Sequence, residues 1–128
     1  MTPTIERLDA TLGAVVTAVD LADMDEAAWR CIEDAFHQYA MLVFPAQNLS
    51  GEAQIAFAKR FGAMELLRPD PKAEAVMISN QVADGSLTGP DDHLYQVLRG
   101  NEGWHTDSSY MPLASKASVL SAQVVPPA

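Results

Sequence analysis

The first half of the chain switches between two periods of apolar and polar positions. Residues 14–19 form a short β-branched run, Ala-Val-Val-Thr-Ala-Val, which lies between a glycine and an aspartate and predicts a strand. Apolar residues then recur at helical spacing as far as about Tyr39, and Asp23 and Glu26 have the spacing of a capping box, so a helix is predicted. The predicted buried stripe of this helix consists of Ala28, Ile32, Ala35, Phe36 and Tyr39.

Further apolar runs continue the alternation of strands and helices. Residues 41–44 are apolar and are followed by a proline, which predicts a buried strand. Ser50 suits the N-cap of a second helix, and Gly62 is a natural stop for it. Residues 76–79 and 115–125 predict two more strands. The inward-facing residues of the second helix are expected to be Ile55, Ala58 and Phe61.

A long polar stretch separates the last two predicted strands. Residues 80–103 contain glycines and acids and predict a loop, and a loop of this length inside a domain is usually functional or mobile. The order is therefore strand, helix, strand, helix, strand, loop, strand, which belongs to the α+β class. The last strand would leave an open edge, which complete proteins usually cover, so we expect the chain to be the front part of a longer fold.

Composition and charge indicate which kinds of partner are not expected for the chain. It has 128 residues, of which 48% are hydrophobic and 20% charged, and its formal net charge is −9. Such an acidic chain repels phosphate backbones, so no nucleic acid is expected as a partner. No apolar run is long enough for a membrane span or a signal peptide, and the single cysteine, Cys31, excludes an intrachain disulfide. We expect a cytoplasmic protein without a membrane partner.

One pair of residues offers metal chemistry. Trp104, His105, Thr106 and Asp107 are predicted to open an extended segment, in which residues two apart point to the same side. An imidazole and a carboxylate would then point together, as two corners of the 2-His-1-carboxylate triad that holds iron(II) and leaves coordination positions open. Thr106 and Trp104 would face away, and the indole would pack behind the site and limit the access of water.

The pair taken alone leaves an ordinary alternative open. The pattern His-x-Asp occurs by chance in many proteins, and the two side chains would then be a hydrogen-bonded histidine and a turn cap. A hydrolytic metal protein also uses such pairs, but it would require further His or Asp clusters, which this sequence lacks.

Other polar side chains are weaker candidates. His37 is expected to be solvated on the first helix, whereas His93 lies in the polar stretch and would contact a substrate or solvent, with a role as third ligand disfavoured. Tyr95, Arg99 and Lys116 would line a pocket or lie on the surface.

Four segments of the chain carry a family resemblance in one order. They are residues 13–21, 41–62, 101–112, which contain Asn-Glu-Gly-Trp-His-Thr-Asp-Ser-Ser-Tyr, and 117–127, which end in Val-Pro-Pro. Together they resemble the taurine/2,4-D dioxygenase family, whose members are iron(II)- and 2-oxoglutarate-dependent oxygenases. The resemblance covers nearly the whole chain, and this makes it far more specific than the His-x-Asp pattern.

The resemblance implies roles for three residues and a fold. His105 and Asp107 would bind Fe(II), and Asn101 would contact the substrate. The co-substrates would be 2-oxoglutarate and O2, and the reaction would be the oxidative hydroxylation of a small organic acid. The implied fold is the N-terminal part of a double-stranded β-helix, a jelly-roll-like barrel, with two helices packed on its outside.

The sequence also departs from the family pattern. In the family a Val-Pro-Pro stretch continues into a Gly-Gly-Asp-Thr-like segment, and a second histidine ligand and an arginine that binds 2-oxoglutarate follow much later. None of these is present, so residues 1–128 are expected to form a single incomplete catalytic domain that is inactive alone. The alternative is an inactive truncated fragment that acts at most as a binding or self-associating module, for instance as a homo-oligomer.

Overall fold

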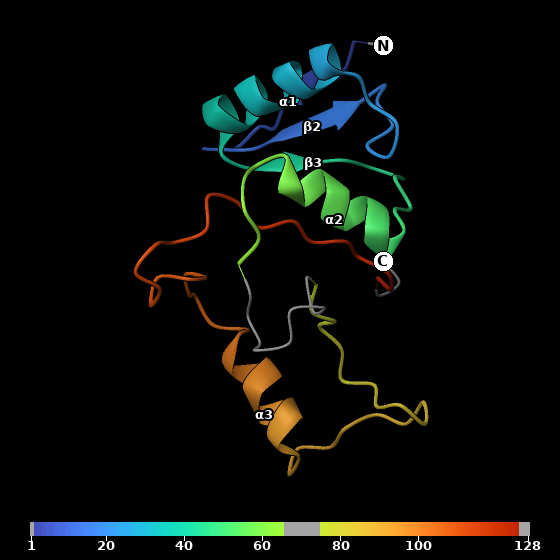
Figure 1. Cartoon of the computed structure of the whole chain (residues 1–128). Coiled ribbons are helices and arrows are strands. Elements are labelled where there is room, and N and C mark those ends of the chain that lie inside the picture. The colour runs from blue at the N-terminus through green and yellow to red at the C-terminus, as the bar shows by residue number, and fades with distance from the viewer. Residues whose placement is uncertain (1, 66–74, 126–128) are drawn as a thin grey trace. The chain divides into compact units, whose positions relative to one another are not determined.

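The computed structural model describes residues 2–65 and 75–125. The chain divides into two units, one made of residues 1–60 with 119–128 and the other of residues 61–118. Three strands and three helices are present in the described part, in the order β1, β2, α1, β3, α2, α3 (Figure 1). The predicted α+β class is confirmed. Pro126 and Pro127, the prolines of the Val-Pro-Pro motif, lie outside the described residues.

A three-stranded sheet underlies the first unit. β1 (Thr4–Arg7) pairs antiparallel with β2 (Ala14–Thr17), and β2 pairs in parallel with β3 (Leu42–Val43), so the order is β1-β2-β3. Ala14 and Val16 are fully buried and Val15 between them is half-buried, as expected for side chains that alternate between the faces of a strand. The predicted strands 14–19 and 41–44 are thus present but shorter, and β1 was not predicted.

Helix α1 (Glu26–Tyr39) makes the crossover between the two parallel strands and packs against β2 and β3. Its N-cap is Asp25, whose side chain accepts a hydrogen bond of 2.7 Å from the amide of Ala28. The prediction of Asp23 as the cap was wrong, because the amide of Asp23 bonds to the carbonyl of Asp20 in a preceding turn. The helix ends at Tyr39, and its C-cap is Ala40, which has the left-handed φ of 62°.

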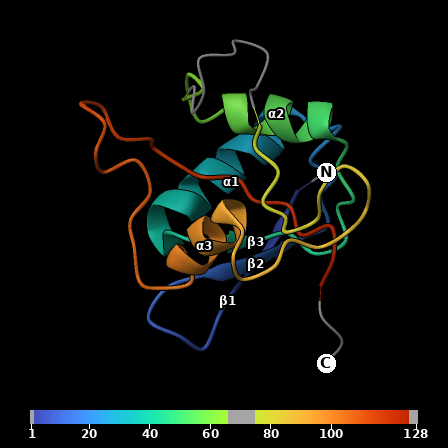
Figure 2. The same cartoon turned by 90° about the horizontal axis from the view of Figure 1, so that it is seen from below.

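Aromatic side chains join α1 to helix α2 (Gly51–Lys59). Trp29 meets Phe57 edge to face at 6.2 Å, and Phe44 meets Phe57 at 5.7 Å. In Figure 2 α2 lies near the N-terminal end of α1, which carries Trp29. The buried residues of α1 are Ala28, Trp29, Ile32 and Ala35. The predicted stripe therefore holds for three positions, whereas Phe36 and Tyr39 are only half-buried.

Helix α2 begins as predicted and ends earlier. The Ser50 side chain accepts from the amide of Ala53 at 3.2 Å, which confirms the cap, while the C-cap is Arg60 and not Gly62. The buried residue of this helix is Phe57, and the expected inward-facing residues Ile55, Ala58 and Phe61 are half-buried. The Arg60 guanidinium lies 4.8 Å from the centre of the Trp29 ring and 2.5 Å from the Glu26 carboxylate. The C-cap of α2 thus adds a cation–π contact and an ion pair to α1.

The second half of the chain differs most from the prediction. The stretch predicted as a loop contains helix α3 (His93–Gly100), which is capped by Asp92 through a 2.7 Å bond from the amide of Leu94. Residues 76–79 and 115–125 are not strands, and an isolated bridge joins Gln81 to Leu87 instead. A β-branched run becomes a strand only where another strand supplies hydrogen bonds, and no such partner lies beside these two runs in the described part. No helix among the described residues is long and apolar enough to cross a membrane.

Candidate metal centre

His105 and Asp107 converge in the second unit. Nε2 of the imidazole lies 3.4 Å from Oδ1 of the carboxylate, and the two side chains are 47% and 64% exposed. Nδ1 of the same ring lies 2.8 Å from the carbonyl oxygen of Gly103. A carbonyl only accepts, so Nδ1 carries the proton in the neutral ring and Nε2 keeps its lone pair. The two available donor atoms, one nitrogen and one oxygen, therefore face each other.

The spacing of these atoms suits a shared metal ion. Two ligand atoms about 2.1 Å from one ion, and at right angles to each other, are separated by about 3.0 Å. The observed 3.4 Å is slightly wider, and small side-chain rotations of two partly exposed residues close the difference. One imidazole with one carboxylate also suits iron(II) or manganese(II). The two residues thus fit a divalent metal of this kind.

The backbone that carries the pair is not the predicted strand. Residues 104–111 have no strand or helix hydrogen bonds. The amide of Met111 donates to the carbonyl of Ser108, and this bond forms a turn over residues 108–111. Trp104 is fully exposed, so the prediction that it packs behind the site was wrong. His105 and Asp107 therefore point together in an irregular segment, in which the Gly103 carbonyl holds Nδ1 of His105 and a turn follows Asp107.

A carboxylate from far along the chain reaches this turn. The hydroxyls of Ser108 and Ser115 both donate to Oε2 of Glu65. The Ser108 bond, followed by the Ser115 bond, lowers the pKa of Glu65, because hydroxyl donors favour the ionised form. Glu65 was not predicted as a site residue, and no local pattern would have revealed it, since it stands 43 residues before Ser108.

The remaining candidates do not join the pair. Asn101 is the exposed C-cap of α3, and its amide bonds to the carbonyl of Leu98 at 3.1 Å. His93 is exposed at the start of α3, and His37 is exposed on α1, as predicted. Among the described residues, no group of three His, Cys, Asp or Glu side chains is arranged to hold a metal. The structure therefore places no third ligand beside the pair within residues 2–65 and 75–125.

Arg99 is engaged within its own helix turn. Its guanidinium lies 3.2 Å from the carboxylate of Glu102, and a side-chain hydrogen bond with Tyr95 raises the pKa of Arg99. Both partners are on the same short segment, so the charge is partly neutralised locally. This makes Arg99 a weaker candidate for an anionic substrate than the sequence indicates.

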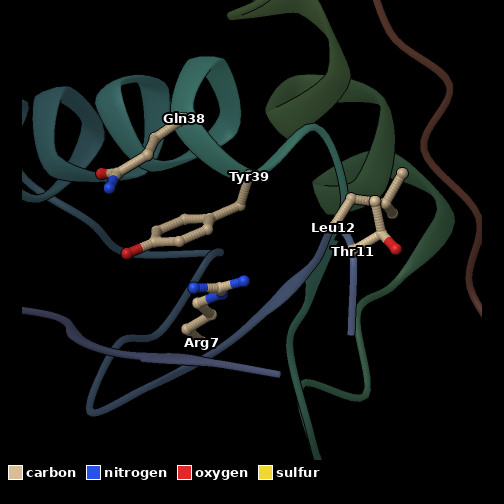
Figure 3. A pocket seen from close by; sticks show the side chains of 5 residues that line it. All are labelled: Arg7, Thr11, Leu12, Gln38 and Tyr39. Atoms are coloured by element: carbon tan, nitrogen blue, oxygen red, sulfur yellow. The ribbon is translucent and has the colours of Figure 1, made fainter. Parts of the chain in front are cut away.

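A surface pocket lies in the first unit and contains none of the predicted site residues. It is lined by Arg7, Thr11, Leu12, Gln38 and Tyr39. Figure 3 shows the Tyr39 ring and the Arg7 side chain facing each other across it. The lining has one cation and no acid or histidine, so it offers no metal chemistry.

Comparison with known proteins points to one family. Residues 4–128 match the family described as taurine catabolism dioxygenase TauD, TfdA family. The chain is 51% identical over 124 residues to an (S)-phenoxypropionate/alpha-ketoglutarate-dioxygenase of Sphingobium herbicidovorans, and the match covers 95% of this chain and 41% of that relative. It is 35% identical over 129 residues to an alpha-ketoglutarate-dependent 2,4-dichlorophenoxyacetate dioxygenase of Cupriavidus pinatubonensis, with 94% and 45% covered. The chain thus spans less than half the length of these relatives.

A solved structure resembles the fold. The crystal structure of AAD-2 in complex with Mn(II) and N-oxalylglycine matches with a TM-score of 0.75 and 33% identity. The match covers 89% of this chain and 39% of that one.

Proposed function

The chain belongs to the TauD/TfdA dioxygenase family, and from this premise we propose that it supplies two metal ligands to a 2-oxoglutarate-dependent dioxygenase. The observation that carries the proposal is the approach of His105 Nε2 to Asp107 Oδ1 at 3.4 Å, with Nδ1 tied to Gly103. The relatives named as alpha-ketoglutarate-dependent dioxygenases support the choice of co-substrate. The activity is that of the whole protein to which this chain contributes.

In this proposal the metal is Fe(II) and the chain's part is to hold it. His105 contributes Nε2 and Asp107 contributes a carboxylate oxygen, and the remaining protein ligand comes from sequence outside the described residues. The Mn(II) and N-oxalylglycine in the AAD-2 crystal support this assignment, because Mn(II) favours similar ligands and N-oxalylglycine is an analogue of 2-oxoglutarate. When bound, the iron would couple the oxidation of 2-oxoglutarate to succinate and CO2 with hydroxylation of the substrate by O2.

The proposed substrate is an aryloxy acid. Two relatives are named for phenoxypropionate and 2,4-dichlorophenoxyacetate, and both compounds join an aromatic ring through oxygen to a short acid. Asn101 is proposed to contact this substrate, since its exposed side chain lies on the segment that leads into His105. Asn101→Ala should then raise KM for the acid and leave α3 folded, because alanine keeps the backbone amide that caps the helix. An unchanged KM in this variant would contradict the contact with the substrate.

The proposed fold of the whole domain is a double-stranded β-helix. In it, residues 1–128 form one incomplete catalytic domain, the N-terminal part, and α1 and α2 pack on the outside. The likeness to AAD-2, with its TM-score of 0.75, supports this arrangement. A cytoplasmic location and self-association stay predictions.

The experiment that tests the metal role is an anaerobic Fe(II) titration with and without 2-oxoglutarate. It compares the whole protein that contains this chain with its His105→Ala and His37→Ala variants, and His37 serves as control because it is an exposed histidine on α1. We expect 2-oxoglutarate to tighten binding, His105→Ala to abolish it and His37→Ala to leave it unchanged. Binding that ignores both 2-oxoglutarate and His105→Ala would contradict the proposal and favour the inactive binding module. Turnover is measured on the protein that contains this chain, as succinate formed from 2-oxoglutarate in the presence of phenoxypropionate.

A further inference from the structure

Ser108 has an unusual backbone for its residue type. Its φ is 57°, in the left-handed region, and its exposed fraction is only 7%. An L-residue other than glycine keeps such a conformation only where the surroundings hold it, and such residues cluster at functional sites. Ser108 follows Asp107 directly, so its conformation sets the path of the backbone that carries one of the two metal ligands.

The group that holds Ser108 is the carboxylate of Glu65. The Ser108 and Ser115 hydroxyls both donate to Oε2, and the two hydroxyl oxygens lie 3.4 Å apart. The other carboxylate oxygen, Oε1, is buried and has no hydrogen-bond partner in the part of the chain that the structure describes. Hydrogen bonds from hydroxyls to a charged carboxylate are stronger than bonds between neutral groups, so Glu65 holds both serine side chains in place.

We propose that Glu65 is a positioning residue for the metal ligands, acting through the Ser108 hydroxyl to keep Asp107 aimed at His105. The inference rests on the metal role proposed above for those two residues. Residues 104–111 have no strand or helix hydrogen bonds, so the orientation of His105 and Asp107 depends on side-chain bonds such as that from Ser108 to Glu65. Partners that orient metal ligands typically change affinity by about 10- to 100-fold when they are removed.

Four single variants separate positioning from general stability. Glu65→Ala removes the acceptor. Ser108→Gly removes the hydroxyl but tolerates the positive φ, and Ser115→Ala removes the other donor to the same oxygen, away from the ligands. Asp84→Asn is the matched control, because the Asp84 carboxylate also accepts a serine hydroxyl, from Ser86 at 2.6 Å, in the same unit.

The first readout is the affinity for Mn(II), measured by calorimetry on the whole protein that contains this chain, alongside circular dichroism as a check of folding. Glu65→Ala and Ser108→Gly should each weaken binding by about 10- to 100-fold, and the double variant should lose no more than the larger single loss, since both act through one bond. Ser115→Ala should have a smaller effect, and Asp84→Asn none. If Glu65→Ala does not fold, Ser108→Gly alone decides the question. Wild-type affinity in a folded Glu65→Ala or Ser108→Gly variant, or equal losses for Ser108→Gly and Ser115→Ala, would overturn the proposal.

The second readout needs no metal. In nuclear magnetic resonance spectra of the metal-free chain, the Ser108 amide coupling and the Asp107 and His105 shifts report the turn. Glu65→Ala should remove the positive-φ signature of Ser108 and move the His105 and Asp107 signals, and Asp84→Asn should move neither. Unchanged signals in Glu65→Ala would overturn the inference. If the chain gives the expected spectra but the whole wild-type protein binds no Mn(II), the proposed function is contradicted instead, so the two failures are distinguishable.

Discussion

Nε2 of His105 lies 3.4 Å from Oδ1 of Asp107, although the two residues share no strand. In a strand their common direction would follow from the pleat. Here it depends on the bond between Nδ1 and the carbonyl of Gly103 and, as we propose, on the hydrogen bond from Ser108 to Glu65. Such an arrangement makes the pair sensitive to changes outside the pair itself.

Loss of the Asp107 charge should weaken metal binding. Asp107→Asn keeps the size of the side chain but replaces a carboxylate oxygen with a neutral amide, so we expect the Mn(II) affinity to fall by at least about 10- to 100-fold, the range seen when merely an outer partner is removed. Calorimetric titration measures the change. Asp91→Asn, which alters an exposed carboxylate of the same unit, is the control and should bind as the wild type does. Equal affinities for the two variants would exclude Asp107 as a ligand.

A glycine at the end of α1 should stabilise the protein. Ala40 has φ 62°, a region that is unfavourable for alanine and free for glycine. Ala40→Gly is expected to raise the free energy of unfolding by about 0.5–1 kcal/mol, after the larger entropy of the unfolded glycine chain is subtracted. Ala56→Gly, at an exposed position inside α2, should lower it by about 1 kcal/mol. Urea denaturation of both variants checks this, and a loss of stability in Ala40→Gly would refute the assigned helix end.

Ile32 should be a main source of stability in the first unit. Its side chain is fully buried on α1, so Ile32→Ala is expected to cost about 2–5 kcal/mol through lost burial and the cavity that remains. Leu12→Ala removes a side chain of the same size that is 49% exposed, and should cost no more than about 1.5 kcal/mol. Urea denaturation measures both losses of free energy of unfolding, from the shift of the midpoint where the dependence on urea concentration is unchanged. Similar costs at the two positions would argue against the packing of α1 on the sheet.

The N-cap of α1 should make stability depend on pH. The hydrogen bond from the Ala28 amide lowers the pKa of Asp25, so the ionised cap stabilises the folded state. Because the pKa of Asp25 is lower in the folded state, the ionised carboxylate adds to the free energy of unfolding. This contribution is fully present above the pKa of the unfolded chain, near 3.8, and is lost as the pH falls through the pKa of the folded state. The difference in melting temperature between the wild type and Asp25→Asn should therefore be largest near neutral pH and shrink in acid.

The control for this pH series is Asp34→Asn, which removes an exposed carboxylate from the same helix that is not its N-cap. It should leave the melting temperature near neutral pH close to that of the wild type. A difference between Asp25→Asn and the wild type that grows in acid would show the opposite sign and contradict the assigned cap.

Local patterns were enough to predict much of the first unit. The strand at Ala14–Thr17, the helix that ends at Tyr39 and the Ser50 cap follow from β-branched runs, helical spacing and capping chemistry, which act between residues a few positions apart. The missed elements have weak local signals. β1 reads Thr-Ile-Glu-Arg and forms because β2 pairs with it, and α3 is a short helix in a polar stretch that buries none of its residues.

The sequence by itself determined the chemistry of the candidate site, because the residue types of His105, Asp107 and their neighbours carry it and the family resemblance rests on those letters. It did not determine how the two side chains meet. In the tertiary structure the segment that carries His105 and Asp107 is irregular and not a strand, Trp104 is exposed, and Glu65 contacts Ser108, which is 43 residues away in the sequence. The physical reason is that hydrogen bonds between distant residues depend on how the whole unit folds, and no local period of the sequence encodes them.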